Sequence, residues 1–488
     1  MRYWRELLLL SGVVLSGFVR ADETVTDGSL PVYSPDGLKL AFQRETSEGV
    51  RLGVCDLKTK AVTWVDGAPG HAAQAAWHPT DGSLVYVCGN ETQTAKEGFF
   101  AKNQTGWNLR IWRTGVSVPL TSGRFWDYTP SFSPDGQFVY FASTRVPVAP
   151  GMSSGTVLYR VPASGGKPEQ LTDYAGNSSG ISMPSVSPDG KRLVWAALNS
   201  AFDAWYLAVA RTAAPRRSCR VSSPGLVAYS PRWSPDGKYI CCTGFRAGDP
   251  GWMVYVVNPL TGAERRLFAG REPAFSPDGR KLAYSAGGKI FEHALGPEDW
   301  PNGGAVPEKP EMPPARALLK ASAAKAGDRF AMSPDFAFRD DKTFYVRFKG
   351  LAPRQACVAG AQCAFAGRYA ESALGFQIVF HNGGICTFAL RTKTGEYFGL
   401  QSNRRIAWGA PVEIVCVRHG DSAYVSVNGS ELLGKTLPGT LDLKTPQFVE
   451  VMPLYHGAAP TCRIDELEVG AGWPKGLPVP ATPGEMFE

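Results

Sequence analysis

Long hydrophobic runs are almost absent from this chain of 488 residues. The one such run, residues 7–19, has thirteen residues, whereas a helix needs roughly 20 to cross a bilayer. Arg2 and Arg5 precede it, and Val19 and Ala21 occupy the two positions that guide cleavage, so residues 1–21 are predicted to be a secretory signal. A retained anchor is the alternative. Because no later stretch approaches membrane length, we expect a periplasmic or secreted protein with no transmembrane segment in the mature chain.

Motifs for metal, redox and nucleic-acid chemistry are missing as well. None of the ten cysteines forms a Cys-x-x-Cys pair, which argues against zinc and thioredoxin-like sites. We expect most cysteines to be small core residues that function does not depend on, with Cys357 and Cys363 as the one candidate pair for a local disulfide. Only six histidines are present, and just His71 falls in a predicted ligand-facing loop, so no metal or other cofactor is expected. No basic cluster with interleaved aromatics occurs, so nucleic-acid binding is not expected either.

What the chain does have is a repeated tight turn. Ser-Pro-Asp-Gly occurs at 34–37, 133–136, 187–190, 234–237 and 276–279, and a looser copy, His-Pro-Thr-Asp-Gly, occurs at 78–82. Ser starts such a turn, Pro presets φ at the second position, and Gly accepts the left-handed conformation that closes it. Each copy is followed by an apolar run of β-forming residues, as at 138–141, which predicts a hairpin. The aspartates of successive copies are 42 to 54 residues apart, a period typical of propellers and solenoids.

Each repeat carries enough β-type runs for a four-stranded blade. A third run follows the second in all six repeats, as at 50–57 and 253–257, and a fourth follows in five of them. The sixth repeat lacks a fourth run because Pro297 begins a Pro/Gly-rich stretch, whereas Glu23-Thr24-Val25-Thr26 precedes the first turn. We therefore predict that residues 23–26 pair with 289–295 and close the ring, which removes an open sheet edge.

These repeats resemble those of TolB-type β-propellers. The resemblance covers residues 22–296, with five of the six turn motifs intact, and it implies a six-bladed propeller. For function, TolB implies a partner role in assemblies of the cell envelope.

The rest of the chain reads as a linker and a second all-β unit. Residues 297–314 contain six prolines, which predict a stiff linker. The Ala/Lys-rich segment that follows, 315–326, predicts a short helix ending at Gly327. Ser-Pro-Asp at 333–335 is followed by Phe336 instead of Gly, so no seventh blade is expected there. Further β-type runs follow at 343–348, 375–380, 385–390, 412–417, 423–429 and 463–469.

The order of motifs in this second unit resembles laminin-G-like, concanavalin-A-like jelly rolls. The motifs are Phe-Tyr-Val-Arg-Phe at 344–348, Trp408, Val-Asn-Gly at 427–429 and Ile-Asp-Glu at 464–466. The resemblance implies a jelly roll over 328–473 that binds glycan or protein, followed by a Pro-rich tail at 474–488. We interpret Asp465 and Glu466 as structural residues, with a metal site as the alternative. The predicted fold class is thus all-β, a six-bladed β-propeller followed by a β-sandwich.

No catalytic motif stands in a suitable context. Gly-Asn-Ser-Ser-Gly at 176–180 matches the nucleophile-elbow pattern, but that motif needs a strand–turn–helix setting with acid and His partners downstream. Propeller-bearing peptidases also need a separate α/β domain, and polysaccharide lyases on similar propellers use a His cluster that this chain lacks. We therefore expect no enzyme. The alternative is a carbohydrate-active enzyme, a lyase or glycosidase, with paired acids at the propeller mouth.

Binding by the propeller is expected on the face opposite the repeated turns. This face, here called the loop face, consists of the loops that enter each innermost strand and those that join its second and third strands. These loops vary in length between blades, and variable loops on a scaffold are where binding usually resides. They supply the candidate ligand-binding residues Trp126, Asp127, Tyr128, Arg145, Arg246, Arg271 and Glu272, and the excursion 89–107 should overhang them.

Structural roles are the alternative for several of these candidates. Arg145 and Arg246 could brace their hairpins, and Trp126 and Tyr128 could cap the inner strands. With ligand contact as the hypothesis, the sequence favours an exported, non-catalytic binding or scaffold protein whose partner is a protein or a glycan at the cell envelope.

Overall fold

The computed structural model describes residues 22–47, 49–66, 71–89, 106–145, 155–172, 180–199, 204–307, 311–332, 343–354, 361–370, 373–381, 384, 386–391, 397–402, 406–420, 422–429, 433–436, 448–451 and 461–487. The predicted signal at 1–21, most of the excursion 89–107, residues 176–179 of the elbow-like motif and the Ser-Pro-Asp segment at 333–335 lie outside the described residues. Expectations about those segments stay predictions.

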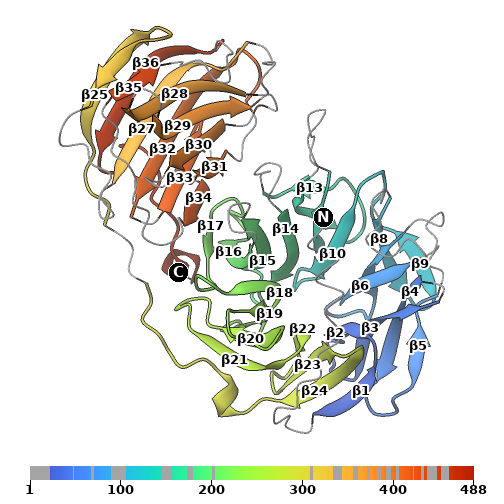
Figure 1. Cartoon of the computed structure of the whole chain (residues 1–488). Helices are drawn as coiled ribbons and strands as arrows, with labels where there is room; N and C mark the ends of the chain where they lie inside the picture. Colours follow the sequence, from blue (N-terminus) through green and yellow to red (C-terminus); the bar gives the residue numbers. More distant parts are fainter. Residues whose placement is uncertain are drawn as a thin grey trace.

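Six four-stranded antiparallel sheets follow one another along the first part of the chain (Figure 1). Blade 1 consists of β2 (Ser29–Tyr33), β3 (Lys39–Thr46), β4 (Gly49–Asp56) and β5 (Val62–Trp64), and blade 2 of β6 (Ala72–Trp77), β7 (Leu84–Cys88), β8 (Asn108–Arg113) and β9 (Val116–Pro119). Blade 3 consists of β10 (Asp127–Phe132), β11 (Phe138–Ser143), β12 (Val157–Pro162) and β13 (Glu169–Gln170), and blade 4 of β14 (Gly180–Val186), β15 (Arg192–Asn199), β16 (Ala204–Arg211) and β17 (Ser218–Arg220). Blade 5 consists of β18 (Val227–Trp233), β19 (Ile240–Phe245), β20 (Met253–Val257) and β21 (Glu264–Ala269), and blade 6 of β22 (Arg271–Phe275), β23 (Lys281–Ala286), β24 (Lys289–Ala294) and β1 (Glu23–Asp27).

The sheets form a closed ring. The innermost strand of each blade contacts the innermost strand of the next, from β2 through β6, β10, β14 and β18 to β22, and β22 contacts β2 in turn. This is a six-bladed β-propeller, as the repeats predict.

The ring closes as predicted, with the first strand of the chain completing the last blade. Strand β1 pairs antiparallel with β24, with Glu23 opposite Glu292 and Asp27 opposite Lys289. Just before β1, Asp22 Oδ1 lies 3.0 Å from His293 Nδ1 of β24. The other ring nitrogen of His293 lies 3.3 Å from Asp299 Oδ2. The start of β1 is therefore tied to the last blade by side chains as well as by the strand ladder.

The repeated turns form the face of the ring opposite the loop face, here called the turn face. In blade 5, Ser234 Oγ donates to Asp236 Oδ1 (2.6 Å), and the backbone N–H of Tyr239 donates to Ser234 Oγ (2.9 Å). The turn glycine, Gly237, has a φ of 70°, where a side chain would be strained. The other intact copies repeat the Ser–Asp bond. The polar atoms of these turns thus bond within the turn itself.

The second unit consists of two six-stranded antiparallel sheets. One has the order β25 (Arg316–Ala324), β36 (Arg463–Ala471), β27 (Phe344–Leu351), β32 (Pro411–His419), β33 (Ser422–Val427) and β34 (Leu433–Thr436). The other has the order β26 (Arg329–Ala331), β35 (Phe448–Val451), β28 (Ala361–Ala370), β29 (Ala373–His381), β30 (Cys386–Arg391) and β31 (Tyr397–Gln401). Each predicted β run of this half overlaps one of these strands.

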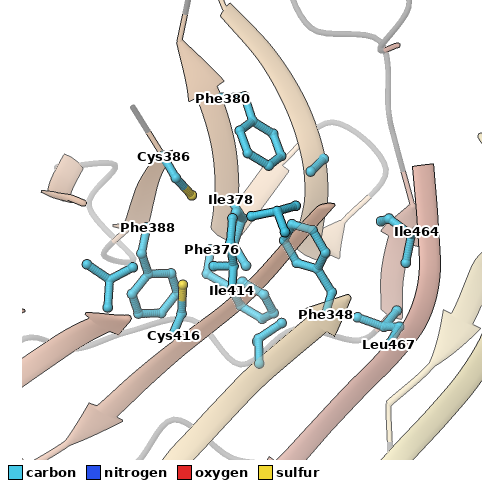
Figure 2. Close-up of a cluster of buried hydrophobic side chains, with 14 of the residues drawn as sticks. Phe348, Phe376, Ile378, Phe380, Cys386, Phe388, Ile414, Cys416, Ile464 and Leu467 are labelled. Atoms are coloured by element: carbon cyan, nitrogen blue, oxygen red, sulfur yellow. The ribbon is translucent and has the colours of Figure 1, made fainter. Parts of the chain in front are cut away.

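The core of this unit lies between its two sheets (Figure 2). Phe348 and Ile414 from the first sheet pack with Phe376 and Phe388 from the second, and all four are nearly or fully buried. Alternate residues of each strand thus face a shared apolar layer, which makes the unit a β-sandwich. The laminin-G-like assignment within this class stays a prediction.

Cysteines occupy the cores of both units. The nine cysteines among the described residues are all buried, which agrees with their predicted role as small apolar residues. Burial raises the pKa of the Cys219 thiol, and likewise that of Cys462, to about 12. A thiol that stays protonated at neutral pH is a poor nucleophile. Cys357 lies outside the described residues, so its pairing with Cys363 stays a prediction.

The helix predicted at 315–326 is wrong, because this segment is strand β25. It pairs antiparallel with β36, with Arg316 opposite Ala471 and Ala324 opposite Ile464. Ala and Lys favour a helix, but a short helix gains little stability from propensity alone. Pairing with β36 satisfies the backbone groups and lets Leu318 and Leu319 pack against the sandwich core. The sandwich therefore begins before residue 328.

Two short helical segments tie the sandwich unit to the turn face of the propeller. After the last blade, η2 (Pro297–Asp299) leads to Trp300, whose ring lies parallel to that of Phe275 with centroids 5.9 Å apart. At the far end of the chain, α2 (Pro483–Phe487) packs on blades 4 and 5. Met486 of α2 is buried in the apolar cluster that these two blades share.

Candidate functional site

The innermost strands share an unusual backbone position that builds the centre of the propeller. Each has one residue with a φ between 50° and 57°, and a register shift in the strand ladder accompanies it. These six residues, here called the inner ring, are Leu30, Gln74, Thr129, Met183, Ser230 and Glu272. Residues other than glycine rarely adopt this conformation, so a repeated local interaction must stabilise it.

The stabilising interaction passes from blade to blade. The backbone N–H of Thr129 donates to the side chain of Gln74 (2.9 Å), and that of Met183 donates to the hydroxyl of Thr129 (3.0 Å). The N–H of Ser230 donates to Met183 Sδ (3.1 Å). The side chains of Gln74, Thr129 and Met183 thus each cap the backbone N–H of the inner-ring residue in the next blade. The register shifts of the inner strands leave those N–H groups without a partner in the strand ladder.

Glu272, a predicted ligand-binding residue, belongs to this ring. Its carboxylate accepts the backbone N–H of Leu30 (3.0 Å), which links blade 6 to blade 1, and the hydroxyl of Ser285 (2.6 Å). The backbone N–H of Glu272 itself is capped by Thr243 Oγ1 of the neighbouring strand β19 (2.7 Å), and not by the inner-ring residue of blade 5. Glu272 thereby holds a structural position at the ring closure, and a ligand role for it stays a prediction.

The predicted residues of blade 3 form a bracing network. Asp127 is fully buried and accepts hydrogen bonds from Ser143 Oγ (2.6 Å), Thr121 Oγ1 (2.7 Å) and Arg145 Nε (3.0 Å). Arg145 also donates to the carbonyl of Ser122 (3.0 Å). These bonds agree with the structural alternative, since they join the loop before β10 to the end of β11.

The two aromatic candidates of blade 3 pack against each other with their ring planes tilted by 34°. The rings of Trp126 and Tyr128 lie 5.1 Å apart, and Tyr128 is buried while Trp126 is half-buried. Burial raises the pKa of the Tyr128 hydroxyl to about 12, so it stays a neutral hydrogen-bonding group. Only the half-exposed part of Trp126 is open to a ligand from outside.

Arg246 is braced too but stays more accessible. Its guanidinium donates to Ser223 Oγ (2.6 Å) and pairs with Glu264, yet 43% of its side chain is exposed. Glu264 therefore orients a guanidinium that a ligand can still reach. Beside it, the backbone N–H of Arg246 donates to Asp249 Oδ2 (2.8 Å), which shapes the loop between β19 and β20.

Asp249 is held ionised in this loop. It accepts hydrogen bonds from Tyr255 Oη (2.7 Å) and Arg266 Nη1 (2.8 Å). Burial alone would raise the pKa of Asp249, but these bonds lower it below its usual range.

An aromatic cluster at blades 5 and 6 completes the loop face. Trp252, just before β20, lies edge-on to Tyr229 of β18 (5.1 Å, 81°) and against Phe245 of β19 (5.7 Å). The guanidinium carbon of Arg271, from β22, lies 5.5 Å from the Trp252 ring centre. We call these four residues the Trp252 cluster. Phe245 is 37% exposed, an uncommon environment for a phenylalanine in a folded protein.

The sequence candidates thus fall into separate groups. Trp126, Asp127, Tyr128 and Arg145 lie together on blade 3, Arg246 lies with Glu264 on blade 5, and Arg271 joins the Trp252 cluster while Glu272 joins the inner ring. Sequence reasoning missed Tyr229, Phe245 and Trp252. One signal could have found Tyr229, because it precedes the inner-ring residue of its blade as Tyr128 does in blade 3. The sequence signal for Phe245 and Trp252 is weaker: they stand on either side of the loop that contains Arg246.

The described residues contain no group of three or more His, Cys, Asp or Glu side chains placed to hold a metal ion. His71 is buried, lies 6.0 Å from the ring of Trp107, and accepts the backbone N–H of Val50 through Nδ1 (3.0 Å). Across the part of the chain with assigned structure, no helix has the length and apolar character that a membrane crossing requires.

Comparison with known proteins gives distant similarities only. No protein-family model matches the chain. Over 212 residues it is 27% identical to an uncharacterized peptidase, YuxL, of Bacillus subtilis, a match that covers 41% of this chain and 28% of that protein. The chain therefore spans little more than a quarter of the length of this relative.

Solved structures of propeller proteins are similar at low identity. TolB from Acinetobacter baumannii is 18% identical with a TM-score of 0.39, over 55% of this chain and 63% of that chain. An oligogalacturonate lyase in complex with manganese is 14% identical with a TM-score of 0.38, over 56% of this chain and 91% of that chain. The fold assignment stands on the sheet topology: an all-β protein in which a closed six-bladed propeller precedes a sandwich.

Proposed function

We propose that this is an exported, non-catalytic binding protein whose propeller contacts a protein or glycan ligand at the cell envelope through the Trp252 cluster. The observation that carries the proposal is the combination of Phe245, Trp252 and Arg271 at one place on the loop face, with Phe245 37% exposed. On blade 3, by contrast, the polar candidates bond to one another.

The chemistry of the cluster suits recognition of a ring or a peptide. Aromatic faces stack against sugar rings and apolar side chains, and Trp, Tyr and Arg are the residues enriched at binding hot spots. The packing of Trp252 against Tyr229 fixes its orientation, so little side-chain entropy remains to be lost when a ligand binds. Arg246, oriented by Glu264, adds a hydrogen-bond donor to the same blade.

The acids near the cluster support binding over acid–base catalysis. A general acid needs a raised pKa, whereas the pKa of Asp249 is lowered by its bonds to Arg266 and Tyr255 despite burial. Glu264 is 9% exposed and engaged by Arg246 and Ser223. These two carboxylates therefore serve as partners of arginines, an arrangement that suits a rigid recognition surface.

Export and the role of the sandwich complete the proposal. The predicted signal over residues 1–21 directs the chain to the periplasm or the outside, where TolB-like proteins act in envelope assemblies. The sandwich, through its laminin-G-like motifs, is proposed as a second glycan- or protein-binding unit.

The test is a glycan array together with a pull-down from an envelope extract, both with the mature chain. Phe245→Ser and Arg271→Ala are expected to weaken binding roughly 5- to 30-fold each, the size of a hot-spot loss. Trp408→Ser is the comparison variant for the sandwich, because Trp408 is 42% exposed there. Unchanged binding by both propeller variants, with loss in the Trp408 variant, would move the site to the sandwich. Turnover of a bound glycan would replace the proposal with the enzyme alternative.

A further inference from the structure

Two segments outside the blades dock at neighbouring blade junctions on the turn face. A junction is defined by the residue two places after the turn glycine of one blade and the residue just before the turn of the next. At the junction of blades 5 and 6 these are Tyr239 and Phe275, and Trp300 packs on both, at 4.7 and 5.9 Å. At the junction of blades 4 and 5 they are Arg192 and Trp233, and Phe487 packs on both, at 4.4 and 6.2 Å.

The two docked segments have the same design. Pro297-Glu298-Asp299-Trp300 and Pro483-Gly484-Glu485-Met486-Phe487 each begin with a proline, form a single helical turn that carries acids, and end on an aromatic residue. Proline is pre-organised for the first position of a helical turn. In both segments an acid bonds to the propeller: Asp299 approaches His293 (3.3 Å), and Glu485 accepts from Arg217 (2.7 Å). Both junctions therefore bind a short segment that carries a proline, an acid and an aromatic residue.

The junction of blades 1 and 2 repeats the features of the junction that holds Phe487. Its two residues are Lys39 and Trp77, in place of Arg192 and Trp233. The indole N–H of Trp77 donates to the carbonyl of Val32 (3.0 Å), just as that of Trp233 donates to the carbonyl of Ser185 (3.1 Å). A basic residue at the same strand position and an indole held by the same kind of hydrogen bond therefore occur at both junctions.

Around this junction an exposed apolar residue and two exposed lysines are available to an acidic, apolar occupant, beside the carboxylates of Asp36 and Asp56 that lie near Lys39. Leu38, next to Lys39, is 63% exposed, the largest exposed fraction among the exposed large apolar residues of the described chain. Lys58 lies exposed in the loop between β4 and β5, which corresponds to the loop of blade 4 that carries Arg217. None of the ring contacts between described residues involves Trp77.

Other junctions are built differently. Between blades 2 and 3, His78 fills the space edge-on to Phe132 (5.0 Å). Between blades 6 and 1, the hydroxyl of Tyr33 bonds to Glu292 (2.5 Å). Between blades 3 and 4, Val186 stands where the aromatic would be.

We propose that the junction of Lys39 and Trp77 is a docking site for a segment of another polypeptide with the pattern proline, acid, aromatic. The aromatic side chain of the segment packs on Trp77 and Leu38, and its carboxylate pairs with Lys39 and Lys58. This site lies on the turn face, so it is independent of the ligand proposed for the loop face.

The probe is a fluorescein-labelled peptide with the sequence of residues 481–487, acetylated and amidated, added to the full mature chain. Its own tail occupies the Phe487 junction at high effective concentration, so anisotropy reports on the junction of blades 1 and 2. We expect saturable binding that Lys39→Glu and Leu38→Ser each weaken at least fivefold. Lys167→Glu is the matched control, an exposed lysine of blade 3 on the turn face, and should change the affinity less than twofold.

Further arms keep the test decisive. Trp77→Phe retains an aromatic ring without the indole N–H, so it tests the junction if Trp77→Ala fails to fold. A peptide with Phe487→Ala should not bind. Absence of binding, or equal binding by the Lys39→Glu and Lys167→Glu variants, overturns the proposal. So does a Trp77-dependent dimer in sedimentation velocity, because a second copy of the chain would then be the occupant.

Discussion

At the scale of single residues, each blade contains two residues with a left-handed backbone conformation, one in the turn and one in the inner ring. Only the turn residue can be recognised from the sequence. The turn residue is always glycine, as Gly237 and Gly279 are, because only glycine adopts this conformation at no steric cost. The inner-ring residue can be Leu30, Thr129 or Glu272. Its strain, of order 1–2 kcal/mol per residue, is compensated by a cap from the neighbouring blade, which no local pattern reveals.

The inner ring makes Thr129 a sensitive position. Thr129→Val keeps the shape but removes the acceptor for the N–H of Met183 (3.0 Å), so we expect a loss of about 1–3 kcal/mol in the free energy of unfolding. Thr129→Asn keeps an acceptor and tolerates positive φ, so it should be neutral or stabilising. Urea unfolding followed by tryptophan fluorescence measures both. Thr114→Val is the control, at a φ of 42° in an exposed hairpin, and equal effects of Val and Asn at Thr129 would contradict the capping role.

At the scale of elements, one short strand decides whether the propeller has an edge. Strand β1 comes from the start of the described chain and completes a blade built from residues 271–294. Its middle residue, Val25, is buried with Tyr33 and Ile290. Strand β1 therefore covers an edge of β24 that would otherwise be open to other chains.

Val25→Asp should open this edge. A carboxylate in the apolar cluster is expected to cost on the order of 3 kcal/mol, and the freed edge of β24 should make the protein aggregate below its normal melting temperature. Static light scattering during a thermal ramp shows both effects. Glu23→Gln serves as the control, since its exposed pair with Lys60 (2.8 Å) contributes at most about 1 kcal/mol. A Val25→Asp protein that melts like the wild type would mean that β1 does not hold the ring closed.

At the scale of the whole molecule, the sandwich is tied to the propeller from both of its ends. The chain leaves the propeller through Trp300 and returns to it through α2, and both contacts fall on the turn face of blades 4 to 6. Arg217 bonds to Glu485 (2.7 Å) and to the carbonyl of Val479 (3.2 Å). Two attachments restrict the sandwich far more than a single linker does, and both lie on the face opposite the loop face.

A charge swap tests the second attachment. Arg217→Glu and Glu485→Arg each place like charges together, so each should release the tail, which small-angle scattering detects as a larger radius of gyration. The double variant restores opposite charges and should recover most of the wild-type value, because only the bond to the Val479 carbonyl is lost. Limited proteolysis at residues 474–482 provides a second readout. An unchanged radius in both single variants would show that the apolar contacts of Met486 and Phe487 suffice.

Taken alone, the sequence determined the blades, their order and the closure of the ring, because turn chemistry and alternating β runs are local properties of the chain. It also identified the buried cysteines and the principal strands of the sandwich. Only the tertiary structure decided that residues 316–324 are a strand, since a partner 140 or more residues away outweighs Ala/Lys helix propensity. The same holds for the site: Asp127 and Arg145 meet within a blade and turn toward each other, while Tyr229, Trp252 and Arg271 converge from two blades. Such contacts depend on how the sheets are placed around the ring, and that placement is a property of packing between blades, not of any one repeat.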